Sequence, residues 1–299
     1  MHFQKALVLF AFLSALVISC QPQKPEKGAE MPKKQLKLSK EWKSYWFDGT
    51  AEITSYQLSQ SRYGSERTGK AVMIFVTEDL RKEEQVKANS RSEKSATVLK
   101  RNTTKRFLTG IYPYQIMSST FNWIRNPESF AKTSLSMQEW CGHSYLQLNN
   151  RDEYVLMRHS YFEGEADQQL PLDKIPTEDG LYNDIRLRPE TIKTDTLVML
   201  PSLEFLQLEH LPIKGYRAEI QIKEIDSIRQ FEVYYPEIDR HLHISTQKDF
   251  PHTILGWTED YKNHLSTARK LQTIKVPYWQ LNRVQDSLER KKLQLNEMD

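Results

Sequence analysis

Residues 217–225 read RAEIQIKEI, and residues 230–235 (QFEVYY) and 240–245 (RHLHIS) follow after short connections. In the first segment Ala218 and Ile220 alternate with charged side chains, which is the period of a β-strand with one buried face. Short connections favour antiparallel neighbours, because parallel neighbours need crossovers of a dozen or more residues. The C-terminal half therefore predicts an antiparallel meander.

The same period recurs upstream, where we expect strands at residues 51–58, 69–77 and 154–162. Residues 78–104 are rich in Lys, Arg and Ser and are weakly periodic. We expect a loop there, with a short strand leading into Lys105.

Helical signals are sparse. Thr177, followed by Glu and Asp, predicts the start of a short helix around Leu181. A second helix is predicted after Pro277, with one apolar face formed by Leu281, Val284, Leu288 and Leu295. The fold class is therefore mainly β: a large curved antiparallel sheet, either a half-barrel or two packed sheets, with a short helix and a C-terminal helix.

Residues 1–19 (MHFQKALVLFAFLSALVIS) place Lys5 before an apolar stretch that ends at Cys20. This stretch is shorter than the roughly 20 residues of a membrane-spanning helix and fits a signal peptide. Residues 17–20 (VISC) resemble the bacterial lipoprotein signal, in which the cysteine is diacylated before cleavage. The resemblance implies that diacylglyceryl-Cys20 anchors the mature chain to a membrane. An uncleaved anchor helix, or a disulfide between Cys20 and Cys141, remains an alternative.

Residues 20–38 combine the cysteine with Pro, Gly, Lys, Glu and Gln and offer almost nothing to bury, which is typical of a flexible tether. No repeat or composition break follows, so residues 39–299 are expected to form a single β-rich domain. In familiar lipoprotein sorting, Asp after the cysteine retains a protein at the inner membrane. Gln21 stands there instead, which favours an exported protein of the outer membrane.

Charge and motifs exclude several functions. Lys and Arg number 42 against 39 Asp and Glu, for a formal charge of +3, which is too balanced for electrostatic binding of nucleic acid. The sequence contains no GxGxxG, GxxxxGK[ST] or GxSxG motif, so phosphate-cradling loops and the common serine hydrolases are not expected. We expect no cofactor.

Residues 137–143 (MQEWCGH) form the most suggestive cluster for chemistry. If they form a strand, Glu139, Cys141 and His143 lie on one face and Trp140 lies on the other. A thiol, a base and an orienting carboxylate are the elements of a cysteine nucleophile. The alternative is that Cys141 is a small buried residue beside a structural tryptophan.

Two further groups of residues are candidates for binding. Asp239, His241 and His243 would share one strand face and are residue types that bind metals. No HExxH motif or Cys-rich partner accompanies them, and a strand face in contact with solvent explains them equally well.

Aromatic residues also cluster, and such clusters stack sugars, line lipid cavities or pack curved sheets. The aromatic binding candidates are Trp46, Tyr112, Tyr114, Trp123, Trp140 and Trp257.

Four stretches carry a family resemblance: residues 46–56 (WFDGTAEITSY), 110–114 (GIYPY), 138–143 (QEWCGH) and 250–257 (FPHTILGW). They resemble a family of uncharacterised exported bacterial lipoproteins often labelled septum formation inhibitor Maf. The Ser-x-Ser-Pro-Arg-Arg loop of genuine Maf nucleotide pyrophosphatases is absent, so no catalytic residue carries over. The strand-rich pattern is also similar to the Lol lipoprotein carriers, which hold acyl chains in a hydrophobic cavity.

Together these patterns favour a membrane-anchored, non-catalytic binding or carrier module of the cell envelope, with a lipid, a glycan or an envelope protein as ligand. One alternative is an envelope enzyme that uses Glu139, Cys141 and His143. The other is a scaffold that docks a protein partner through Leu281, Val284 and Leu288 of the C-terminal helix.

Overall fold

The computed structural model describes residues 37–296 of the 299-residue chain, and these belong to one compact unit, Gln35–Asp299. Cys20, the predicted signal peptide and nearly all of the predicted tether lie outside the described residues, so lipidation stays a prediction. None of the helices between residues 37 and 296 combines the length and the apolar character needed to cross a membrane.

Fourteen strands within residues 37–296 form one antiparallel sheet, in the order β8-β7-β6-β5-β4-β3-β2-β1-β14-β13-β12-β11-β10-β9. Neighbours in the sheet are neighbours in sequence, except that the first strand pairs with the last. The strands are β1 (Ala51–Arg62), β2 (Ser65–Arg81), β3 (Ser95–Thr109), β4 (Tyr112–Trp123), β5 (Phe130–Glu139), β6 (Gly142–Asn150), β7 (Tyr154–Ser160), β8 (Gln168–Leu172), β9 (Asp195–Met199), β10 (Tyr216–Ile225), β11 (Ile228–Tyr235), β12 (Arg240–Gln247), β13 (Ile254–Tyr261) and β14 (His264–Val276).

The two edges of the sheet, β8 and β9, approach each other without pairing. The chain just beyond them forms a short parallel bridge between Thr177 and Leu200. Its hydrogen bonds run from the Glu178 N–H to the Leu200 carbonyl and from the Leu200 N–H to the Pro176 carbonyl, both 2.9 Å long. The predicted fold class is confirmed, and of its two versions the single curved, barrel-like sheet is the one observed.

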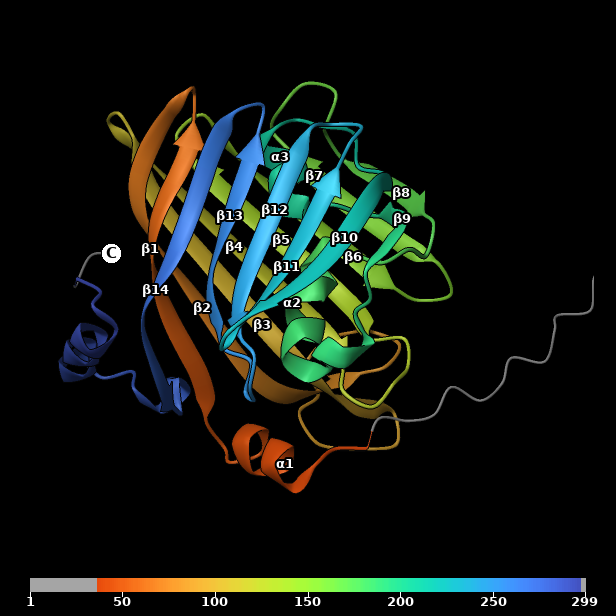
Figure 1. Cartoon of the computed structure of the whole chain (residues 1–299), viewed down its shortest axis with the longest axis vertical. Coiled ribbons are helices and arrows are strands. Elements are labelled where there is room, and N and C mark those ends of the chain that lie inside the picture. Colours follow the sequence, from red (N-terminus) through yellow and green to blue (C-terminus); the bar gives the residue numbers. More distant parts are fainter. Residues whose placement is uncertain (1–36, 297–299) are drawn as a thin grey trace, which may run out of the picture. The chain divides into compact units, whose positions relative to one another are not determined.

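Three α-helices are described: α1 (Lys40–Trp46), α2 (Glu178–Leu187) and α3 (Leu203–Leu208). The predicted helix around Leu181 is α2, and the Thr177 hydroxyl caps it by accepting the Gly180 N–H at 3.0 Å. The sheet curls around α2 and α3 (Figure 1). The Asn183 side chain of α2 accordingly donates to backbone carbonyls of both β3 and β4.

The loop predicted over residues 78–104 is wrong. Strand β2 continues to Arg81 and β3 begins at Ser95, so the connection is much shorter. The inward face of β3 carries polar residues because it meets charged residues of the helices: Arg101 lies 3.5 Å from Asp179, and Lys105 lies 2.6 Å from Glu204. This strand therefore lacks the alternation of apolar and polar residues on which sequence recognition of strands depends.

The C-terminal helical segment is present, but as the 3₁₀ helices η2 (Tyr278–Gln280) and η3 (Val284–Leu293). Its apolar residues do not share a face, because a 3₁₀ helix has three residues per turn. Val284 and Leu288 are 91% and 54% exposed, whereas Leu293 and Leu295 pack on Ile53 at the outer face of the sheet. A further 3₁₀ turn, η1 (Pro189–Thr191), follows α2.

Candidate functional site

The interior of the curved sheet is filled with ion pairs as well as apolar side chains. Arg186 of α2 makes two hydrogen bonds to the Glu52 carboxylate, at 2.7 and 2.6 Å. Arg240 of β12 binds Glu178 in the same way, at 2.5 and 2.8 Å. Each of these four residues is at most 2% exposed. The pairs tie the two ends of α2 to β12 and β1, so the helix is part of the core and not a detachable lid.

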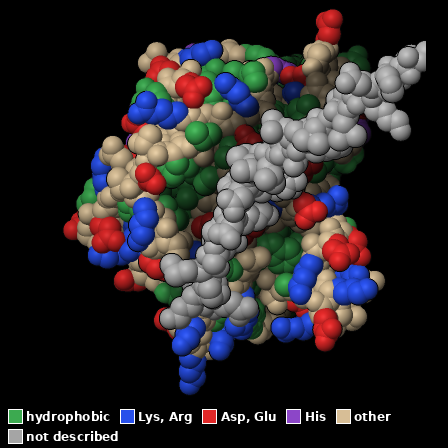
Figure 2. Space-filling view, turned by 90° about the vertical axis from the view of Figure 1, so that its right-hand side faces the viewer, with side chains coloured by type: hydrophobic (Ala, Val, Ile, Leu, Met, Phe, Trp, Pro, Cys, Tyr) green, Lys and Arg blue, Asp and Glu red, His purple; other side chains and the backbone are tan. Residues whose placement is uncertain are grey.

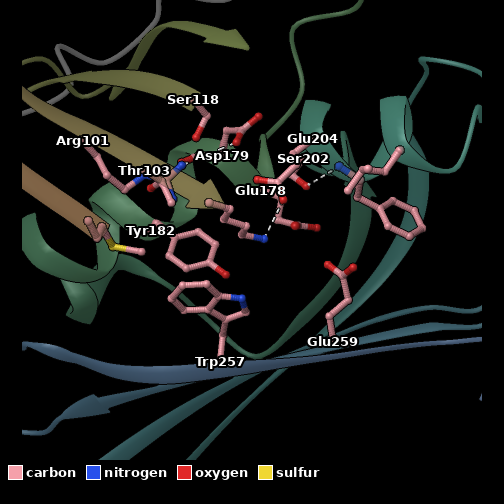
Figure 3. A pocket seen from close by; sticks show the side chains of 14 residues that line it. Arg101, Thr103, Ser118, Glu178, Asp179, Tyr182, Ser202, Glu204, Trp257 and Glu259 are labelled. Carbon is pink, nitrogen blue, oxygen red and sulfur yellow. Dashed lines mark hydrogen bonds and ion pairs between the residues drawn. The ribbon is translucent and has the colours of Figure 1, made fainter. Parts of the chain in front are cut away.

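A small pocket remains between α2, α3 and the strands (Figure 3). Tyr182 and Trp257 form one wall, with ring centroids 6.4 Å apart, and the carboxylates of Glu178, Glu204 and Glu259 lie on the other side. The cavity volume is about 40 Å³. That volume holds a few water molecules, whereas sites for organic ligands usually measure about 300–1,000 Å³.

The polar groups of this pocket are not all paired within the described part of the chain. The Arg101 Nε–H and the Thr103 hydroxyl have no hydrogen-bond partner among residues 37–296. Burial raises the pKa of Asp179 to about 6, although the Arg101 guanidinium opposes the shift. Buried polar groups of this kind usually bind ordered water, which fits the pocket's size.

A larger, open cleft of about 430 Å³ lies at the seam between the two sheet edges. Its walls include Leu172, Ile175 and Val198, together with the charged side chains of Asp173 and Lys214. Acidic and basic side chains are mixed over the face of the molecule seen in Figure 2. The part of that face drawn in colour therefore shows no large patch of a single sign that would attract a polyanion.

Aromatic side chains gather where β1–β2, β3–β4, β5–β6 and β7–β8 turn at one end of the sheet. We call this group the aromatic end; it consists of Tyr63, Tyr112, Tyr114, Trp140 and Tyr161. The Tyr112 ring lies 6.1 Å from Tyr114 and 6.3 Å from Trp140, centroid to centroid. The hydroxyls of Tyr63 and Tyr114 are 2.8 Å apart. Tyr161 packs against Gly142, where a Cβ atom would lie only 2.7 Å from its ring.

Three of the five aromatic residues are exposed to solvent, whereas Tyr114 is buried. Tyr63, Trp140 and Tyr161 are 59%, 69% and 75% exposed. The neighbouring hairpin adds Leu108 at 58% and Ile111 at 83%. Scattered apolar residues are normal on a protein surface, but a contiguous group usually marks an interaction site.

Two-residue turns join β1–β2, β3–β4 and β5–β6 at this end, whereas Tyr161 lies in the longer connection between β7 and β8. Tyr63 and Gly64 both have positive φ (54° and 70°), as the type I′ turns favoured in two-residue hairpins require. The ladders close immediately beneath the turns, at Arg62–Ser65, Thr109–Tyr112 and Glu139–Gly142. Apart from Tyr161, the aromatic end is thus built on rigid hairpins.

The catalytic candidates lie beside the aromatic end, but not in the predicted arrangement. Trp140 and Cys141 form the turn between β5 and β6, so the prediction of a single strand across Glu139, Cys141 and His143 is wrong. Cys141 is exposed, and the Glu139 carboxylate accepts its backbone N–H at 2.7 Å. A hydrogen bond from the thiol to the same carboxylate raises the pKa of Cys141, which opposes formation of a nucleophilic thiolate.

Of the metal candidates, His241 and His243 share a face of β12 as predicted, with ring centroids 6.5 Å apart. Asp239 lies in the turn before β12, where it has a positive φ of 49°. The His241 ring stacks on Tyr234 at 4.2 Å, and His243 lies 3.6 Å from Glu232. In the part of the chain that the structure describes, no three His, Cys, Asp or Glu residues are arranged to hold a metal ion.

The aromatic candidates divide into two groups. Trp46, Trp123 and Trp257 are at most 9% exposed and belong to the core. Tyr112 and Trp140 meet at the aromatic end, and Tyr114, which is 2% exposed and also part of the core, lies beneath them. Sequence reasoning missed Tyr63 and Tyr161, which stand outside the aromatic clusters of the sequence and join the group only through the alignment of the hairpins.

Comparisons with known proteins bear on the fold. No protein-family model matches the chain, and no curated protein matches it. A solved structure of a β-barrel-like protein of the domain of unknown function DUF1849, from Brucella abortus, is similar to it. The TM-score is 0.50, the sequence identity is 9%, and the similarity covers 76% of this chain and 98% of that one. What the two chains share is the fold.

Proposed function

We propose that the protein is a membrane-anchored lipoprotein of the bacterial cell envelope, and that its β-rich domain is a non-catalytic binding module which contacts its partner through the aromatic end. The observation that carries this proposal is the exposure of aromatic and aliphatic side chains on neighbouring connections at one end of the sheet. The anchoring rests on the sequence signal at Cys20.

The interior argues against transport of an apolar ligand inside the sheet. An acyl chain there would have to replace α2, and with it the hydrogen bonds of Arg186 to Glu52. Breaking one buried ion pair of this kind costs about 3–5 kcal/mol. The pocket of about 40 Å³ between α2, α3 and the strands is too small for an acyl chain. Binding at the outside end requires no such rearrangement.

Hydroxyl-radical footprinting of isolated envelopes tests the proposal without assuming the partner's identity. Trp140 and Tyr161 are expected to react more slowly in intact envelopes than in the purified protein, because a partner covers them. Trp279, which is 46% exposed and belongs to η2, is the matched control and should react equally in both. Equal reactivity of Trp140 in both preparations would refute docking through the aromatic end, and selective protection of Trp279 would favour the C-terminal scaffold alternative.

A further inference from the structure

We infer that the partner of the aromatic end is the interfacial layer of a lipid bilayer, into which the hairpin turns insert. This inference rests on the proposed function, because it names the partner class for the same surface.

Charge is absent from the β3–β4 hairpin. Residues 107–117 (FLTGIYPYQIM) contain no ionisable group except tyrosine, and their tip carries Leu108 and Ile111 at 58% and 83% exposure. Tyr and Trp are enriched where proteins meet the bilayer interface, because their rings are apolar and their polar atoms remain hydrated. The composition of the aromatic end thus matches a bilayer surface.

Two of the charged groups beside the aromatic end, Arg62 and Glu139, are turned away from its surface, whereas Glu66, Glu163 and Asp167 are exposed next to it. The Arg62 side chain is 12% exposed; its guanidinium lies under the Tyr63 ring at 4.6 Å and donates to the Leu208 carbonyl at 2.7 Å. The Glu139 carboxylate is occupied by the Cys141 N–H. Partial burial, together with the hydrogen bond to Tyr114, raises the pKa of Tyr63 and keeps its hydroxyl neutral at physiological pH. Insertion limited to the tips at Tyr63, Ile111 and Trp140 therefore buries little charge, since Glu66, Glu163 and Asp167 would stay in the hydrated headgroup layer.

The backbone is also suited to insertion. Unpaired N–H and C=O groups are costly in lipid, and the hairpins are paired up to the residues that flank their two-residue turns. A small-molecule or sugar ligand would need a concave site. The pocket beneath the aromatic end, between Tyr114 and His143, measures only about 10 Å³, which is space for about one water molecule.

The predicted tether is long enough for this arrangement. Helix α1 lies at the start of β1, and the aromatic end lies at the finish of the same strand. Strand β1 has 12 residues, so α1 and the aromatic end are about 40 Å apart at roughly 3.3 Å per residue. Residues 20–38 would span at most about 65 Å when extended. A chain anchored at Cys20 can therefore bring the aromatic end to the membrane that holds its own lipid.

Sedimentation with lipid vesicles tests this inference. The mature chain carrying Cys20→Ala, which has no acyl group of its own, is mixed with sucrose-loaded vesicles of phosphatidylcholine and phosphatidylglycerol. We expect the parent chain to co-sediment, and Ile111→Glu and Trp140→Glu to lower the partition coefficient about 10-fold or more each, as expected for the loss of one buried large apolar side chain. Val284→Glu is the matched control, because Val284 is 91% exposed and lies outside the aromatic end.

Circular dichroism establishes that each variant is folded, which the exposure of these positions leads us to expect. Equal partitioning of all variants, or no partitioning of the parent chain, overturns the inference. Protection of Trp140 in envelopes without binding to vesicles would leave the proposed function standing and show that the partner is not lipid. If Trp140 is not protected in envelopes and the parent chain does not bind vesicles, both the proposed function and this inference are refuted.

Discussion

Replacing Arg240 by Met should show that the charged interior is structural. Arg240 is 0% exposed; it binds Glu178 twice and Glu259 once, and its guanidinium lies 4.0 Å from the centre of the Phe205 ring. Methionine keeps much of the apolar stem but removes the charge. It leaves Glu178 buried, with the Tyr235 hydroxyl as a remaining donor at 2.9 Å.

We expect Arg240→Met to lower the free energy of unfolding by about 3–5 kcal/mol at pH 7, the usual effect of removing one partner of a buried ion pair. For a domain of this size that corresponds to a fall in Tm of roughly 10 °C or more. The loss should also depend on pH. Burial by itself would raise the pKa of Glu178, but the charge and hydrogen bonds of Arg240 outweigh burial and hold it below its usual value.

The sign of this dependence follows from linkage. In the parent protein the depressed pKa of Glu178 contributes stability above the unfolded pKa, and that stability is lost as the pH falls through the folded pKa. Without Arg240, burial raises the pKa of Glu178, so its contribution is present at low pH and is lost as the pH rises through the folded value. The difference between parent and variant should therefore be largest at neutral pH and shrink toward pH 4.

Urea unfolding followed by circular dichroism at pH 4, 5.5 and 7 measures these differences. The double variant Arg240→Met, Glu178→Gln should recover part of the lost stability, because the orphaned charge is gone. A loss below about 1 kcal/mol at pH 7, or the same loss at every pH, would refute the view that a buried pair holds α2 in the sheet.

Three further predictions concern single residues. Asp179→Asn should make the free energy of unfolding less dependent on pH between about pH 4 and 6. The reason is that the raised pKa of Asp179, about 6, makes the parent lose stability as the pH rises through this range. Urea unfolding across the range measures the dependence, and an unchanged slope would contradict the prediction. Gly142→Ala should weaken vesicle binding with only a small fall in Tm, because the new Cβ atom would lie 2.7 Å from the Tyr161 ring and displace that ring. Undiminished vesicle binding would contradict this prediction. Cys141 should react with iodoacetamide more slowly than a free cysteine peptide at pH 8, because the Glu139 carboxylate raises the pKa of the thiol. Glu139→Gln should speed the reaction. Mass spectrometry follows the rate, and an unchanged rate in the variant would contradict the role of Glu139.

Much of the sheet could be predicted from the sequence because its strands alternate apolar and polar residues. The segments predicted at residues 217–225, 230–235 and 240–245 are β10, β11 and β12 with small changes at their ends. Strand β3 could not be recognised, since the inward-facing Arg101 is balanced by Asp179 of a helix far away in sequence. Only the tertiary structure supplies the partner that makes a polar strand face stable.

The candidate site was partly visible for a similar reason. Tyr112, Tyr114 and Trp140 could be predicted because aromatic residues cluster around them in the sequence. The predicted strand face with Glu139, Cys141 and His143 does not form, because Trp140 and Cys141 are the two-residue turn of a hairpin. Tyr63 and Tyr161 reach the same place through the meander, which returns every second turn to one end of the sheet.

Site-specific photo-crosslinking in intact cells tests docking through the aromatic end most directly. A photoreactive phenylalanine replaces Ile111 in one full-length chain and Val284 in another, two positions that are 83% and 91% exposed. The account predicts light-dependent adducts from position 111, of lipid if the further inference also holds, and none from position 284. Adducts from position 284 alone, or no adduct from position 111, would contradict it.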